Sequence, residues 1–125
     1  MKYVPIVLSL LLLAGCAAAP EGPSYRQISM DDAIKLMTEA EDYVILDVRR
    51  ADEFAAGHIP GAIHVANESI GSGAIPELPN MDQLIMVYCR SGNRSKQASK
   101  KLAGMGYTNI VEFGGIIDWP GETET

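Results

Sequence analysis

Short apolar runs alternate with amphipathic stretches from residue 25 onward, and this alternation predicts the elements of the fold. Five runs have the β-branched or continuous apolar character of buried strands, at residues 25–28, 43–47, 63–65, 84–88 and 109–113. The first run is the weakest, and the continuous run at residues 84–88 is expected at the centre of the sheet. Strands separated by helical stretches are typical of a layered α/β domain with a largely parallel sheet.

The stretches between these runs predict three helices, at residues 29–37, 51–56 and 95–103. Ser29 can cap the first helix, because its hydroxyl can accept a hydrogen bond from a free amide of the first turn. Glycine is suited to end the other two, and the candidates are Gly57 for the second and Gly104 or Gly106 for the third. Residues 67–80 are expected to be mostly loop.

The first fifteen residues differ in character from the rest and are predicted to be a signal peptide. A short positive start precedes an apolar core at residues 4–13. The residues that follow, Leu13-Ala14-Gly15-Cys16, resemble the lipobox of bacterial lipoproteins, in which cleavage precedes the cysteine and its thiol is acylated. An uncleaved membrane anchor is the alternative, but the apolar run is shorter than the roughly 20 residues of a spanning helix, and Pro5 interrupts it.

Length and composition leave room for one globular domain, because the chain has 125 residues, an apolar fraction of 47% and no repeat. The predicted parts are a signal peptide at 1–15, a lipid-anchored linker at 16–24, the domain at 25–121 and a polar tail at 122–125. We therefore expect an exported protein anchored by lipid at Cys16 to the bacterial cell membrane, inner or outer. Acylation of Cys16 would leave Cys89 as the lone thiol.

The chain is acidic, yet its basic residues are unevenly distributed. The formal net charge is −6, and removal of residues 1–15, which hold one basic residue and no acid, makes it −7. An acidic chain lacks the basic face that nucleic acids need, so we expect no nucleic-acid partner. Five of the nine remaining basic residues closely follow Cys89, namely Arg90, Arg94, Lys96, Lys100 and Lys101. No acid interrupts this segment, so it is expected to attract small anions.

Cys89 is the candidate nucleophile. It directly follows the predicted central strand, at the sheet edge where open α/β folds bind ligands. Gly92 can adopt a positive φ, so that successive amides point at one spot, and the helix starting at Ser95 adds partial positive charge. Arg90 and Arg94 complete this anion cradle, which would lower the pKa of the Cys89 thiol and favour the thiolate. The alternative is an inert buried cysteine.

The same loop resembles the active-site loop of single-domain rhodaneses, through the residues Tyr88-Cys89-Arg90-Ser91-Gly92-Asn93-Arg94-Ser95. Three further stretches resemble motifs of that family in the same order: Leu46-Asp47-Val48-Arg49 with Glu53-Phe54, Gly57-His58-Ile59-Pro60-Gly61-Ala62-Ile63, and Gly114-Gly115-Ile116 to Trp119. Together these motifs extend over nearly everything after the linker. The G-H-I-P-G-A stretch alone would indicate the fold but not the activity.

The resemblance implies a rhodanese fold, with a five-stranded, mostly parallel sheet flanked by helices, and a sulfurtransferase cycle. Cys89 would attack the sulfane sulfur of a donor such as thiosulfate, expel sulfite and carry the sulfur as a persulfide to a thiol or cyanide acceptor. The implied persulfide cradle consists of Arg90, Ser91, Gly92, Asn93, Arg94 and Ser95. No metal or organic cofactor is required. The oligomeric state stays open, with a monomer expected.

Two other functions compete with sulfur transfer. The first is phosphatase or arsenate reductase activity. Related phosphatases have five residues between the cysteine and the loop arginine, whereas four separate Cys89 from Arg94. The shorter loop should suit a single sulfur better than a tetrahedral oxyanion. A non-catalytic module that binds an anion or a partner, or that senses oxidation, is the alternative from a different class.

Four polar residues outside the loop have mainly structural interpretations. Asp47 and Arg49 end the second predicted strand and are expected to form an ion pair, although Arg49 could instead bind a donor oxyanion near the pocket. His58 is expected to make a structural hydrogen bond, and His64 to fill a strand face. No Cys and His spacing of the usual metal-binding kind exists.

Overall fold

The computed structural model describes residues 24–125 of the chain. The signal peptide, the lipidation site at Cys16 and nearly all of the linker lie outside the described residues, so these remain predictions. Within residues 24–125, no helix is both long and apolar enough to cross a membrane.

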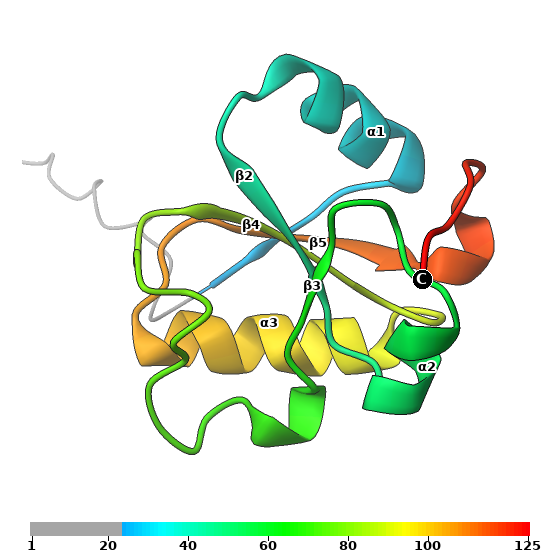
Figure 1. Ribbon diagram of the computed structural model, residues 1–125. Coiled ribbons are helices and arrows are strands. Elements are labelled where there is room, and N and C mark those ends of the chain that lie inside the picture. Colours follow the sequence, from blue (N-terminus) through cyan, green and yellow to red (C-terminus); the bar gives the residue numbers. More distant parts are fainter. Residues whose placement is uncertain (1–23) are drawn as a thin grey trace, which may run out of the picture.

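A five-stranded parallel sheet forms the middle of the molecule, as expected (Figure 1). Its strands are β1 (Arg26–Gln27), β2 (Tyr43–Asp47), β3 (Ile63–His64), β4 (Leu84–Cys89) and β5 (Ile110–Gly115). They lie side by side in the order β1-β5-β4-β2-β3, so the continuous apolar run does occupy the centre of the sheet. The edge strands β1 and β3 are two residues each, shorter than predicted.

Helices cover both faces of the sheet, with α1 on one side and α3 on the other (Figure 1). They are α1 (Met30–Glu39), α2 (Ala51–Ala56) and α3 (Asn93–Met105), together with the short 3-10 helices η2 (Asn67–Ser69) and η3 (Ile116–Asp118). Ser29 caps α1 as predicted, because its Oγ accepts from the Asp32 amide at 3.0 Å. α3 begins two residues earlier than predicted and ends before Gly106 rather than Gly104.

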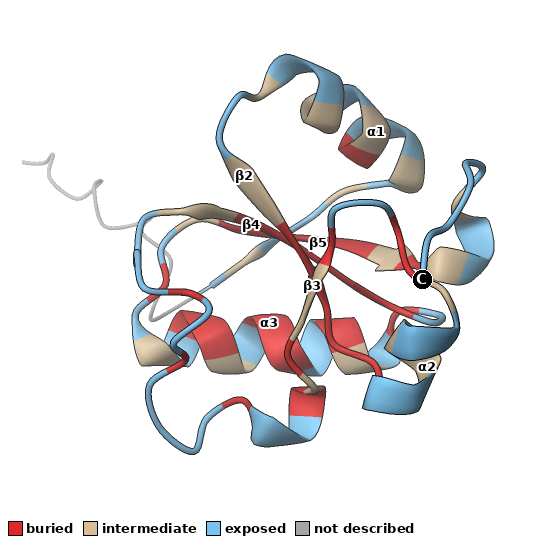
Figure 2. Ribbon diagram, in the orientation of Figure 1, coloured by how far each residue is buried: buried red, intermediate tan, exposed pale blue. Residues whose placement is uncertain are grey.

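Strand β4 divides its side chains between two cores, since neighbouring residues of a strand point to opposite faces. Ile85, Val87 and Cys89 pack on the face covered by α3. Met86 and Tyr88 pack on the opposite face, in the cluster that also contains Ala33 of α1. All of them are buried, and Figure 2 shows this buried band through the middle strands. The alternation therefore brings the thiol to the α3 side of the sheet.

Candidate active site

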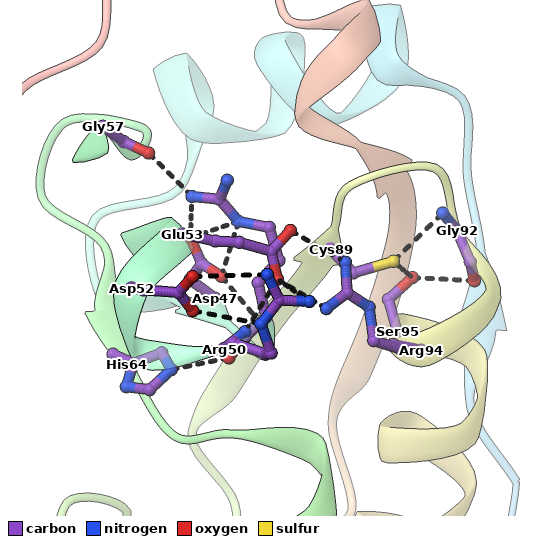
Figure 3. A network of polar contacts seen from close by, with 11 residues as sticks. Asp47, Arg50, Asp52, Glu53, Gly57, His64, Cys89, Gly92, Arg94 and Ser95 are labelled. Atoms are coloured by element: carbon purple, nitrogen blue, oxygen red, sulfur yellow. Dashed lines mark hydrogen bonds and ion pairs between the residues drawn. The ribbon is translucent and has the colours of Figure 1, made fainter. Parts of the chain in front are cut away.

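Cys89 is the last residue of β4 and lies at the base of the loop that leads into α3 (Figure 3). Its side chain is 1% exposed, and its Sγ accepts the Gly92 amide at 3.0 Å and lies 3.4 Å from Ser95 Oγ. Burial acts to raise the pKa of this thiol. The Ser95 hydroxyl and the amides of Ser95, Gly92 and Ser91 outweigh it, so the pKa of Cys89 is lowered from its ordinary value.

Glycines give the loop its shape. Gly92 has φ +118°, in the left-handed region that favours glycine, and this conformation lets α3 start immediately after it. Behind the loop, a Cβ on Gly115 would lie 1.9 Å from the carbonyl oxygen of Arg90. The Ile117 amide donates to the same oxygen at 3.3 Å. The end of β5 therefore supports the loop by direct backbone contact.

The guanidinium of Arg94 binds a carboxylate from another element. It donates to Glu53 of α2 through two bonds of 2.6 and 3.1 Å (Figure 3). These bonds lower the pKa of Glu53 from 4.5 to about 2. The backbone of Arg94 belongs to the expected cradle. The positive charge of its side chain, however, is partly neutralised by Glu53, which lies outside the basic segment that follows Cys89. Arg90, by contrast, is exposed.

Asp47 and Arg49 form the expected ion pair, and it is buried. Their Oδ2 and Nη2 atoms are 2.7 Å apart, and Arg49 Nη2 also donates to the carbonyl of Gly57 at 2.7 Å. The hydroxyl of Tyr88 donates to the same carboxylate at 2.6 Å. This network joins β2, β4 and the residue after α2, and it occupies the guanidinium of Arg49.

A cavity of about 430 Å³ lies next to the loop. The charged side chains of Arg49, Arg90 and Glu53 line it together with the apolar side chains of Ile116 and Ile117. Thr123 also lines it, because the predicted polar tail folds back on the domain. The tail is held by two backbone hydrogen bonds of 2.9 Å between Glu124 and His58.

Both histidines make structural contacts. His58 Nδ1 lies 2.9 Å from the Phe54 carbonyl, and its ring stacks on the Phe54 ring at 3.8 Å between centroids. His64 Nε2 lies 2.6 Å from the Arg49 carbonyl. Among residues 24–125, no group of three or more His, Cys, Asp or Glu side chains is arranged to hold a metal ion.

Sequence analysis did not identify Glu112 of β5 as a site residue. Its carboxylate is 2% exposed and accepts from the Gly114 amide at 3.0 Å and from the Ser95 hydroxyl at 2.5 Å. The Ser95 hydroxyl therefore lies between the Glu112 carboxylate and the Cys89 thiol. A signal was present, because an acid inside a strand that is expected to be buried is unusual and requires a partner.

Comparisons with known proteins place this geometry in context. The thiosulfate sulfurtransferase GlpE of Pseudomonas entomophila is 36% identical over 104 residues, which cover 79% of this chain and 92% of that protein. A solved rhodanese with anions from E. coli has a TM-score of 0.61 at 28% identity, covering 66% of this chain and 98% of that one. A Rhodopseudomonas palustris protein of unknown function, described as a possible tyrosine phosphatase, has a TM-score of 0.66 at 28% identity, covering 76% and 79%.

The family assignment rests on a match that includes every element from α1 onward. The profile of the rhodanese-like domain matches residues 29–121. That range contains Cys89 with its loop, the Arg49 network and the two glycines that end β5. The chain belongs to the family of rhodanese-like domains, whose members include thiosulfate sulfurtransferases.

Proposed function

We propose that this protein is a sulfurtransferase that carries sulfur as a persulfide on Cys89. The Cys89 thiolate attacks the outer sulfur of a donor such as thiosulfate, a new S–S bond forms, and the old S–S bond breaks with its electrons leaving on sulfite. A thiol or cyanide acceptor then attacks the outer sulfur of the persulfide and releases the Cys89 thiolate. Sulfur moves without net oxidation, so neither half-reaction needs an external oxidant or reductant.

The observation that carries this proposal is the contact between Cys89 Sγ and the loop. A buried sulfur that accepts the Gly92 amide at 3.0 Å, and whose pKa is lowered by neighbouring amides and the Ser95 hydroxyl, is suited to exist as a thiolate. The same amides are preorganised to stabilise negative charge on a second sulfur bound to the first. The exposed Arg90, beside the cavity, can attract an anionic donor.

Two features favour sulfur over a tetrahedral oxyanion in the loop. Four residues, rather than the five of related phosphatases, separate Cys89 from Arg94. The Arg94 guanidinium also forms two hydrogen bonds with Glu53, so its charge is already partly neutralised. Phosphatase or arsenate reductase activity would require that cation to bind the substrate oxygens.

Intact-mass measurement tests the proposal directly. The purified protein incubated with thiosulfate should gain one sulfur atom, and subsequent cyanide should remove that sulfur as thiocyanate. Cys89→Ser should show neither change, whereas Cys16→Ser should retain both. A gain that persists in Cys89→Ser would contradict the assigned nucleophile. Oxidation of Cys89 by peroxide, without turnover of any sulfur donor, would instead support the redox-sensing alternative.

A further inference from the structure

The last residues of the chain fold back over the cavity beside the active-site loop. Residues 122–125, the tail, lie beyond the range that the family profile matches, and their sequence predicts only a polar segment. Figure 1 shows the C-terminal end beside the segment that follows α2. The tail therefore contacts a part of the domain that is distant in sequence, and specific contacts must hold it there.

Three hydrogen bonds hold the tail on the G-H-I-P-G-A stretch. The Glu124 amide donates to the His58 carbonyl, and the His58 amide donates to the Glu124 carbonyl, each at 2.9 Å. The Gly61 amide donates to Oε2 of the Glu124 carboxylate, also at 2.9 Å. The same Oε2 lies 3.6 Å from His58 Nε2. Glu124 is thus the residue that fastens the tail to the domain.

The start of the tail is fixed by Trp119. The indole Nε1 of this residue donates to the Glu122 carbonyl at 3.0 Å. Gly121 lies directly against the same ring, since a Cβ on it would be 3.0 Å from Nε1. η3 immediately precedes the tryptophan. The chain is therefore held at both ends between η3 and His58, and Thr123 lies in the span between them.

This span closes one side of the cavity of about 430 Å³ described above. η3 and the end of α2 both line that cavity, and Arg90 lines it from the active-site loop. Thr123 lines it too, and its Oγ1 packs against Gly57, where a Cβ would be 3.3 Å away. Because Arg90 directly follows Cys89 in the chain, the cavity adjoins the nucleophile. A molecule that enters between η3 and α2 meets the tail before it meets the loop.

We propose that the tail is a wall that restricts Cys89 to small sulfur donors and acceptors. Thr123 is the residue of this wall that lines the cavity, and Glu124 is a positioning residue because it holds Thr123 in place. Thiosulfate, cyanide and short thiols reach the sulfur while the tail is closed. A thiol carried by a bulky group or on a protein surface reaches it only when the tail opens. This role rests on the proposed sulfur transfer at Cys89.

The strength of the contacts determines how large the effect should be. Each hydrogen bond favours the closed tail by roughly fivefold, and the conformational entropy that the tail loses on closing offsets part of this gain. We therefore expect the closed form to be favoured by about tenfold. Bulky reagents should react about tenfold faster once the tail is removed, because they react only with the open form.

Alkylation of Cys89 by two neutral reagents with the same reactive group tests the wall without a sulfur donor. Iodoacetamide is small and pyrenyl iodoacetamide is bulky, and mass spectrometry of the Cys89 peptide gives both rates. Removal of residues 122–125 from the full chain should raise the pyrenyl rate about tenfold and leave the iodoacetamide rate within about twofold. Glu124→Ala, which removes the bond from the Gly61 amide, should raise the pyrenyl rate about threefold. Glu68→Ala, the same change at an exposed acid of η2, should alter neither rate.

An equal ratio of the two alkylation rates in the unmodified and the shortened chain would overturn the proposal. This includes a rise of both rates by the same factor, because that result indicates a loosened loop and no wall. If the shortened chain does not fold, Glu124→Ala decides the question, since it keeps both backbone hydrogen bonds of the tail. An unchanged ratio in that variant overturns the proposal.

Sulfur delivery from the Cys89 persulfide gives the second readout. The acceptors are 2-mercaptoethanol and a neutral tripeptide thiol, and shortening the chain should favour the tripeptide by about tenfold. The same preference in both chains would contradict the wall. If no persulfide forms at all, the proposed function fails, while the ratio of the alkylation rates still decides whether the tail restricts access to Cys89.

Discussion

Opposing effects act on the sulfur atom of Cys89. Removal from water disfavours its charged form, while the Ser95 hydroxyl and the loop amides favour it more strongly. The arginine expected to add positive charge, Arg94, is held by Glu53 through two hydrogen bonds. The loop therefore stabilises its anion mainly with neutral dipoles that are fixed in place. Such dipoles suit the proposed persulfide cycle, in which negative charge lies on one sulfur and then on a second one bound to it.

At the residue scale, the ion pair of Glu53 should make stability depend on pH. The pKa of Glu53 is about 2 in the folded chain and 4.5 without its partners, so the folded state favours the ionised form. Its contribution is present above pH 4.5 and is lost as the pH falls toward 2. We expect Glu53→Gln to lower the free energy of unfolding by up to about 1 kcal/mol at neutral pH and to have a smaller effect in acid. Urea unfolding of both proteins across this range measures it, and a constant difference would contradict the assignment.

Elements bring the loop into position through backbone contacts. β4 delivers Cys89 and α3 provides Ser95, while the end of β5 lies directly against the carbonyl of Arg90. At Gly115 this contact leaves no room for a side chain, since a Cβ would lie 1.9 Å from that oxygen. The two glycines of the family motif thus have a physical reason at this point of the fold. Gly114 itself adopts φ +97°.

Gly115→Ala is therefore expected to displace the active-site loop. Sulfur transfer and alkylation of Cys89 at neutral pH should both fall by at least about tenfold, because the amides no longer converge on the sulfur. Gly104→Ala is the matched control, since nothing lies within 4 Å of the added carbon and Gly104 is inside α3. It should stabilise the protein by about 0.5–1 kcal/mol and leave both rates unchanged. Equal effects of the two changes would contradict the proposed contact.

The elements also show which parts of the site could be predicted from sequence. The position of Cys89 at the end of the central strand could be predicted, because the apolar run at residues 84–88 and its length are visible in the local sequence. The early start of α3 was missed because the positive φ of Gly92 lets the helix begin sooner than residue preferences suggest. Glu53 and Glu112 were missed because they reach the loop from α2 and β5, and no local pattern reports such packing.

The whole chain consists of a domain that the structure describes and an N-terminal segment for which only the sequence is informative. The sheet, helices and folded-back tail account for residues 24–125, and the family match covers 29–121. Contacts made by the tail could not be predicted, because the residues that pair with it, His58 and its neighbours, are distant in sequence. We propose from the sequence that Cys16 carries a lipid and that the domain lies outside the cytoplasm.

Replacement of Cys16 by Ser should abolish acylation of the protein. The full chain expressed in a bacterium should label with a clickable palmitate analogue and sediment with the membrane fraction. Cys16→Ser should lose the label, because acylation requires the cysteine thiol. Cys89→Ser serves as the matched control and should keep the label. Label that persists in Cys16→Ser would exclude the lipid anchor.

The side chains of β4 alternate between the two faces of the sheet, and this alternation limits which insertions and deletions the protein can tolerate. Tyr88 binds Asp47 on one face and Cys89 meets Ser95 on the other, so an odd insertion or deletion within β4 would exchange the environments of phenol and thiol. The aromatic ring would then occupy the loop and the sulfur would face the ion pair. Length changes in residues 71–80, which connect η2 to β4 without a helix or strand, leave that parity unaltered. The proposed sulfur transfer therefore depends on the side of the sheet to which each position of β4 points, and one inserted residue is enough to reverse it.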